Sequence, residues 1–102
     1  MKLRILPEAE AETQAVAQWY EDRRRGLSEL FLAAIGDAIK AIERHPKRYP
    51  RPVGVHTKRN VRRFLLSEFP YSVVYEITED EVMIVAVAHA QRRPGYWRRR
   101  IK

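Results

Sequence analysis

The second half of the chain contains three runs of apolar, aromatic and β-branched residues separated by short polar stretches, and this pattern predicts three antiparallel strands joined by tight turns. The strands are expected at 62–66, 69–77 and 82–88, with polar turns at 67–68 and 78–81. In the middle strand every odd-numbered residue is aromatic or β-branched, so one face of this strand is expected to lie on a core. The third strand is an almost continuous apolar run, which is typical of a central strand.

The first half of the chain shows a helical period instead. A short strand is expected at 2–6, where Pro7 ends it and suits the first turn of a helix. Apolar residues then recur at three- and four-residue steps, which predicts helices at 9–24 and 27–45. Gly26 separates them, so the two helices are expected to form an antiparallel hairpin.

The element order β-α-α-β-β-β predicts an α+β fold, in which the helical hairpin packs on a mostly antiparallel four-stranded sheet. Residues 46–60 contain three prolines and one glycine and follow neither period, so they are expected to be a long connection without regular structure. We find no repeat and no linker, and the 102 residues are expected to form a single domain, 1–102.

Composition narrows the class of protein. The chain has no cysteine, which excludes disulfides and thiol catalysis, and its three histidines are dispersed, so no metal and no cofactor are expected. No segment has the length and hydrophobicity of a signal peptide or a membrane span, so we expect a cytoplasmic protein without a membrane partner. The net charge of +7 is uneven, because residues 44–102 carry fourteen basic and five acidic side chains. The binding surface is therefore expected in the second half.

Basic and aromatic residues near the strands are the candidates for binding. They can hold phosphates while their rings stack on bases, or they can bind acidic side chains of another protein. The aromatic pair in this set has a second interpretation, as a C-terminal flap packed over the sheet. The set consists of Arg59, Arg62, Arg63, Arg92, Arg93, Tyr96, Trp97 and Arg98.

Two histidines in this half offer acid–base chemistry near neutral pH, but nothing in their spacing relates them. His56 is interpreted as a solvated loop residue and His89 as a capping or packing residue.

Several segments together resemble the RelE/ParE toxin superfamily, whose members include plasmid stabilisation proteins. The resemblance covers essentially the whole chain. It is carried by WYE (19–21), GL (26–27), FL (31–32), HPKRYP (45–50), RRFLL (62–66), FPYSVVYE (69–76), AVAH (86–89) and RRPGYW (92–97).

The resemblance implies the toxin of a type II toxin–antitoxin module, which inhibits growth until a cognate antitoxin wraps around it in a hetero-oligomer. It leaves the target open. ParE-like members poison DNA gyrase, whereas RelE-like members cleave mRNA on the ribosome, and the shared fold does not choose between them.

The RelE-like catalytic positions can be compared with this chain one by one. A nuclease of this type needs a base, a cation beside the phosphate and an acid. The resemblance places such groups at Arg63, at Arg92 or Arg93 and at Tyr96. Two further basic positions of RelE-like enzymes are occupied here by Leu65 and Ser72, neither of which is charged.

Three hypotheses follow. We favour a ParE-like toxin that binds DNA gyrase and has no catalysis of its own, because two cations are missing and the two helices form a long hairpin. The second is a ribosome-dependent RNA endonuclease with a shifted set of basic residues. The third is a module that binds its antitoxin and has weak or lost toxicity.

Overall fold

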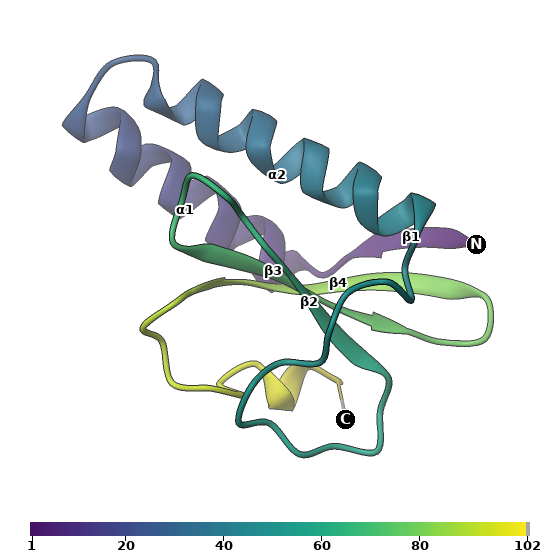
Figure 1. The fold of residues 1–102 in the computed structure, drawn as a ribbon. Coiled ribbons are helices and arrows are strands. Elements are labelled where there is room, and N and C mark those ends of the chain that lie inside the picture. The colour runs from purple at the N-terminus through teal and green to yellow at the C-terminus, as the bar shows by residue number, and fades with distance from the viewer. Residues whose placement is uncertain (102) are drawn as a thin grey trace.

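The computed structural model describes residues 1–101 and contains two helices, four strands and a short 3-10 helix (Figure 1). The predicted order of elements and the α+β fold are confirmed. The elements are β1 (Lys2–Ile5), α1 (Pro7–Arg23), α2 (Leu27–Arg44), β2 (Val61–Leu65), β3 (Tyr71–Ile77), β4 (Glu81–His89) and η1 (Arg98–Ile101).

The four strands form one sheet in the order β1-β4-β3-β2. The meander β2-β3-β4 is antiparallel as predicted, and β1 lies parallel to β4 at the opposite edge. The sequence did not place β1. Its position follows from the helical hairpin, which returns the chain across one face of the sheet before β2 begins.

The helices cover one face of the sheet with the residues that their period predicted. α1 buries Ala9, Thr13 and Ala17, and α2 buries Phe31 and Ile35 together with further residues at helical spacing. These side chains meet the helix-facing residues of β3 and β4 in the larger core. Within residues 1–101, neither helix is long and apolar enough to cross a membrane.

The turn between the helices is held by one carboxylate. Gly26 adopts a positive φ of 93°, which a residue with a Cβ rarely tolerates. Glu21 accepts hydrogen bonds from the backbone N–H of Gly26 at 3.1 Å and from the hydroxyl of Ser28 at 2.7 Å. The hydrogen bonds from Ser28 and Gly26 lower the pKa of Glu21.

The opposite face of the sheet is also covered, which the alternation in the sequence did not predict. Figure 1 shows the connection 46–60 and the C-terminal segment with η1 lying against this face, so the molecule has three layers. A second core forms there from Val61, Val74, Met83, Val85, Ala86, Trp97 and Ile101. The sheet is therefore buried on both sides, and the apolar run of β4 lies between the two cores.

The middle strand begins later than predicted, at Tyr71 instead of Phe69. Pro70 has no backbone N–H for a sheet hydrogen bond, and Tyr71 N–H donates to the carbonyl of Phe69 within the turn. Further along, the register shifts so that Val85 of β4 is an extra residue, a β-bulge that increases the local twist.

Candidate functional site

A cavity of about 250 Å³ lies on the sheet face opposite the helices. Its walls come from the connection 46–60, from the adjoining ends of β2, β3 and β4, and from the segment 90–97. The charged side chains on its walls are Arg63, Arg92 and Arg93, and His89 is beside them. No carboxylate is among the described residues that line it.

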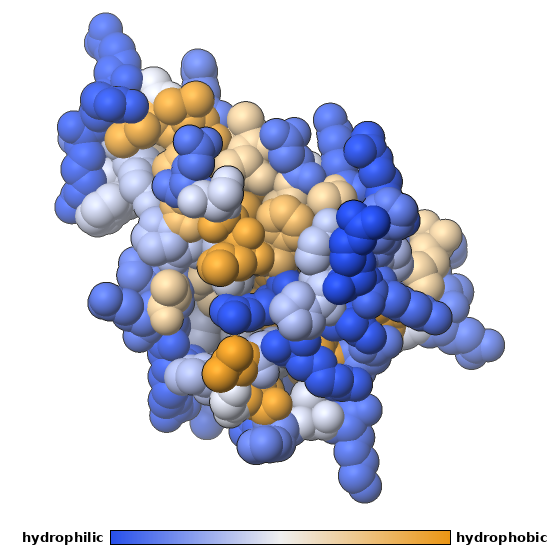
Figure 2. Space-filling model, in the orientation of Figure 1, coloured by the Kyte–Doolittle hydropathy of each residue, from blue (hydrophilic) through white to orange (hydrophobic). Residues whose placement is uncertain are grey.

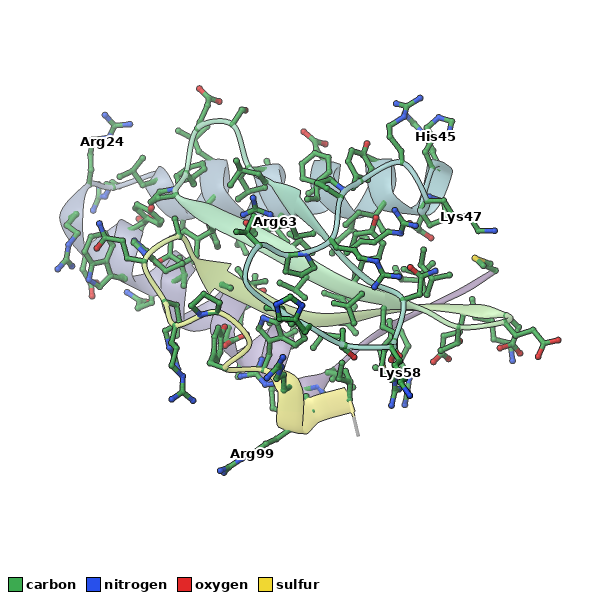
Figure 3. The ribbon with its side chains drawn as sticks, turned by 60° about the horizontal axis from the view of Figure 1, so that its bottom comes forward. Arg24, His45, Lys47, Lys58, Arg63 and Arg99 are labelled. Carbon is green, nitrogen blue, oxygen red and sulfur yellow. The ribbon has the colours of Figure 1, made fainter. Side chains whose placement is uncertain are left out.

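The chain positions each of these arginines differently. Arg63 lies on β2 opposite Val74 and on the same sheet face, and its backbone N–H donates to the carbonyl of Pro50, which holds the connection against the sheet edge. Arg92 and Arg93 follow β4 in a turn in which Arg92 N–H donates to the carbonyl of His89. Figure 3 shows Arg63 over the sheet, whereas Arg24, Lys58 and Arg99 extend outward.

The cavity also has an apolar wall. It is formed by Pro52, Val53 and Val55 on one side and by Pro94 and Trp97 on the other. Val53 is 74% exposed, so this wall is open to a partner. Ser72 contributes a small polar group that is 5% exposed.

Three other arginines from the predicted set hold the connection 46–60 in place. Arg62 donates to the carbonyls of Lys47 and Tyr49, at 3.0 and 2.7 Å. Arg98 donates to the carbonyl of His56 at 2.8 Å. Arg59 pairs with the Glu76 carboxylate, whose side chain is 4% exposed, and this hydrogen bond raises the pKa of Arg59. Arg59, Arg62 and Arg98 do not line the cavity.

Glu12 of α1 binds the described part of the C-terminal segment through its carboxylate. This side chain accepts a hydrogen bond from the Tyr96 hydroxyl at 2.6 Å, two from the Arg100 guanidinium at 2.9 and 3.0 Å, and one from the backbone N–H of Val87 at 3.0 Å. Burial by itself raises the pKa of Glu12, but the hydrogen bonds from Arg100, Tyr96 and Val87 outweigh it and hold this pKa below its ordinary value. The hydrogen bond between Arg100 and Glu12 in turn raises the pKa of Arg100.

The Glu12 and Arg100 side chains act as a substitute for missing strand pairing. The pairing of β1 with β4 ends at Ile84, which leaves the next residues of β4 without a neighbour on that edge. Glu12 accepts from Val87 N–H, and Arg100 donates to the carbonyl of Val85 at 3.0 Å. These contacts satisfy backbone groups that would otherwise be buried without partners.

Tyr96 is fixed by this arrangement. Burial and the hydrogen bond to Glu12 raise the pKa of the Tyr96 hydroxyl far above its ordinary value of 10.0. The Arg92 guanidinium lies over the ring, 4.0 Å from its centroid, and Arg100 approaches the ring as well. The Tyr96 hydroxyl therefore keeps its proton and donates it in a hydrogen bond to the Glu12 carboxylate.

Trp97 is 2% exposed and belongs to the second core. Of the two interpretations of the aromatic pair, the structure has the packed flap. The buried indole leaves little ring surface for stacking on a base, whereas its place on the cavity wall leaves contact of Trp97 with a partner a prediction.

The two histidines do not form an acid–base pair on the cavity. His89 lies on its wall, where Nδ1 accepts from the backbone N–H of Gln91 at 3.0 Å and the ring meets Tyr71 edge-on. His56 is exposed and is not on this wall. Among residues 1–101, no three acidic or histidine side chains are grouped as a metal site requires.

The structure thus brings together Arg63, Arg92, Arg93, Tyr96 and Trp97 from the predicted set and separates the other three from them. Sequence reasoning missed Glu12, because an acidic residue in the first turns of a helix is explained by the helix dipole alone. It is separated from Arg100 by 88 residues, and no local pattern relates the two.

Comparison with known proteins gives a family and a fold. The family model described as "ParE toxin of type II toxin-antitoxin system, parDE" matches residues 3–94. A solved structure of the chromosomal ParDE toxin–antitoxin system from P. aeruginosa matches with a TM-score of 0.65 and 22% sequence identity, covering 87% of this chain and 95% of that chain. No curated protein matches this chain.

Proposed function

Because the chain belongs to the ParE toxin family of type II toxin–antitoxin systems, we propose that it inhibits growth by binding DNA gyrase in the cytoplasm, without chemistry of its own. In this proposal the cognate antitoxin neutralises it by direct binding in a hetero-oligomer. The proposal concerns the target and the mode of action, since the family itself follows from the match over residues 3–94.

The state of Tyr96 is the observation that carries the proposal. RNA cleavage by a RelE-type mechanism needs an acid that gives its proton to the leaving oxygen. The Tyr96 hydroxyl donates to Glu12, and its pKa is raised by burial and by that hydrogen bond, so its proton is poorly suited to transfer. In this proposal the Tyr96 hydroxyl holds the C-terminal segment to α1 through its hydrogen bond with Glu12.

The neutral residues at two basic positions support the same proposal. Leu65 and Ser72 lie opposite each other on β2 and β3. Ser72 is on the cavity wall, where a cation would stabilise the charge of a phosphorane, and Leu65 is 56% exposed. Binding a protein target needs neither charge.

A second candidate, the RelE-like endonuclease, is favoured by a different observation. Arg63, Arg92, Arg93 and His89 line one cavity, so an anion there would meet three guanidinium groups and one imidazole. In this mechanism His89 would have to act in place of Tyr96.

The two functions are tested by inducing the chain in cells without its antitoxin and measuring DNA breaks, plasmid supercoiling and mRNA cleavage in parallel. DNA breaks with intact mRNA are expected. Cleaved mRNA with undamaged DNA would reject the proposal in favour of the endonuclease. Unimpaired growth, with undamaged DNA and intact mRNA, would indicate a module that only binds its antitoxin.

Two variants sharpen the same experiment. Tyr96→Phe keeps the ring beneath Arg92 and removes only the hydroxyl, so toxicity at a permissive temperature is expected to persist. His89→Ala is expected to leave it unchanged as well. A large loss of growth inhibition in folded Tyr96→Phe or His89→Ala protein would indicate that a proton is transferred at the cavity.

A further inference from the structure

Positive charge is concentrated in one of the three layers of the molecule. The layer opposite the helices consists of the connection 46–60 and the C-terminal segment 90–101, which we together call the basic layer. Each of these two segments carries five basic side chains and no acidic one. Residues 1–45, which include β1 and the helical hairpin, carry seven basic and eight acidic side chains. The excess of positive charge therefore lies on one side of the molecule.

Most of these charges are available to a partner. Eight cations of the basic layer are exposed: Lys47, Arg48, Arg51, Lys58, Arg92, Arg93, Arg98 and Arg99. Arg59 and Arg100 are half-buried, and each pairs with a carboxylate from outside the layer. Within residues 1–101, none of the eight exposed cations forms an ion pair. Charges of one sign repel each other, and an anionic partner relieves this repulsion.

The two segments of the basic layer form one continuous surface. Arg98 donates to the carbonyl of His56 at 2.8 Å, and both segments line the cavity of about 250 Å³. In Figure 2, the lower part of the view, where Figure 1 draws these segments, is mostly blue with small isolated orange areas. Apolar side chains gather mainly in the upper part. The surface is thus broad, charged and poor in apolar groups, which suits a charged partner better than an apolar one.

The density of charge on the partner distinguishes nucleic acid from protein. Duplex DNA carries one negative charge per about 1.7 Å of its axis, and cations that neutralise its phosphates release condensed counterions. An extended peptide advances about 3.3 Å per residue, so even a segment made only of acidic residues has about half this charge density. Eight exposed cations on one surface therefore match a duplex better than an acidic peptide.

The aromatic residues of the basic layer favour a duplex over a single strand. Single-stranded nucleic acids bind to rings on which their bases stack. Tyr49 packs edge-on against Phe64. The Tyr96 ring lies beneath Arg92, and Trp97 is 2% exposed. All three Tyr and Trp side chains of the layer are thus packed against protein groups, whereas contacts to the phosphates of a duplex need no ring.

We propose that the basic layer binds the phosphate backbone of duplex DNA, so that the toxin contacts the DNA held by its target as well as the target protein. Binding to DNA follows from the charge of this layer. Its role in growth inhibition rests on the proposed function, because DNA gyrase acts on duplex DNA. No base is read in this arrangement, so the toxin is expected to bind duplexes of different sequence alike.

The first test measures binding of the purified full-length chain to a labelled duplex by fluorescence anisotropy, with no gyrase present. A dissociation constant of about 1–100 μM is expected near physiological salt. With about five phosphate contacts, the slope of log K against log salt is expected near −4.5. A single-stranded RNA of the same length is expected to bind more weakly, because no stacking platform is available.

The variant Lys58→Gln/Arg99→Gln removes two side chains that extend outward from the basic layer (Figure 3). Each phosphate contact contributes about eightfold at 0.1 M salt, so the duplex affinity is expected to fall about fiftyfold. The salt slope is expected to become less steep by about 2. The matched control Arg24→Gln/Lys40→Gln removes the same charge from exposed positions of the helical layer, and a change of about twofold or less is expected because salt screens distant charges.

The second test separates this inference from the proposed function. The affinity of the chain for purified DNA gyrase is measured with and without a duplex bound to the enzyme. The duplex is expected to raise this affinity, and Lys58→Gln/Arg99→Gln is expected to lose the increase while keeping its affinity for gyrase alone. Binding to the duplex without binding to gyrase would support the DNA surface and reject gyrase as the target.

Three results would overturn the inference. The first is a salt slope between 0 and about −1, which would mean that almost no counterion is released. The second is equal weakening of duplex binding by Lys58→Gln/Arg99→Gln and its control, which would mean that net charge acts without a defined surface. The third is tighter binding of the single-stranded RNA than of the duplex. Any of these together with intact binding to gyrase would leave the proposed function in place and reject only the DNA surface.

Discussion

Replacement of Glu12 by glutamine tests how the C-terminal layer is attached to the rest of the molecule. The carboxylate accepts four hydrogen bonds, from Tyr96, from Val87 N–H and twice from Arg100. The glutamine amide has the same size but only one acceptor oxygen. Its NH₂ group would face groups that are themselves hydrogen-bond donors. The substitution therefore removes the charge and leaves Arg100 without its ion pair.

The magnitude follows from the burial of this pair. The Glu12 and Arg100 side chains are 19% and 17% exposed, so solvent screens them only in part. Breaking a fully buried pair costs about 3–5 kcal/mol, and a hydrogen bond to a charged group contributes about 1.5–3 kcal/mol. For this partly exposed cluster we expect the free energy of unfolding to fall by about 3 kcal/mol. With a urea m-value of roughly 1.5 kcal/mol/M, the midpoint would move by about 2 M.

The effect should depend on pH in a defined direction. The folded state lowers the pKa of Glu12 below its ordinary value of 4.5. A carboxylate of this kind stabilises the fold fully above the unfolded pKa, and the stabilisation is lost as pH falls through the lower, folded pKa. The difference between the unmodified chain and Glu12→Gln is therefore expected to be constant near pH 7 and to shrink below about pH 4.

The assay is urea unfolding followed by circular dichroism at several pH values. Glu10→Gln on the same helix is the control, because Glu10 is exposed and accepts only from Gln14 at 3.3 Å, so a change within about 0.5 kcal/mol is expected. Glu12→Ala and Arg100→Ala combined in a double-mutant cycle should couple by more than about 1 kcal/mol. A loss below about 0.5 kcal/mol in Glu12→Gln, or one that persists unchanged at pH 3, would refute the reasoning.

Three further changes test other parts of the fold by the same unfolding measurement. Gly26→Ala should cost about 1–2 kcal/mol because φ is 93° there, whereas Gly36→Ala, within α2 with no neighbouring atom near the added Cβ, should stabilise by about 0.5–1 kcal/mol; equal effects would contradict this. Phe31→Ala, at a fully buried ring, should cost about 3–5 kcal/mol against less than about 1 kcal/mol for the exposed Leu30→Ala. Trp97→Ala should also cost about 3–5 kcal/mol, and an unchanged midpoint would mean that the second core does not contribute to stability.

Local patterns were sufficient for the elements and their order. The period of 3.6 located both helices within two residues of their ends. Pro7 begins α1, Gly26 directly precedes α2, and Pro46 follows two residues after its end, and these residue types favour helix boundaries. Runs of apolar, aromatic and β-branched residues located β2, β3 and β4. The late start of β3 falls at Pro70, a local exception, and the pattern made no prediction about the bulge at Val85.

The candidate site was predicted only in part. Clustering of arginine and aromatic residues in the sequence pointed to the correct segments, and Arg63, Arg92 and Arg93 do line one cavity. Composition could not distinguish these arginines from Arg59 and Arg62, which have the same chemistry and similar positions in the sequence. The difference is whether a carboxylate or a carbonyl lies within reach, and only the fold decides that.

The sequence by itself determined the fold class, the helical hairpin, the meander and the excess of positive charge in the second half, because each depends on residues that are near one another in the chain. The tertiary structure alone decided that both sheet faces are buried, that Trp97 is core, and that Glu12 binds Tyr96 and Arg100 across more than eighty residues. Such contacts depend on how the layers meet. The residues that make them are far apart in the chain, so no local sequence pattern predicts them. The same contacts decide that Tyr96 holds the C-terminal segment and which arginines remain free for a partner.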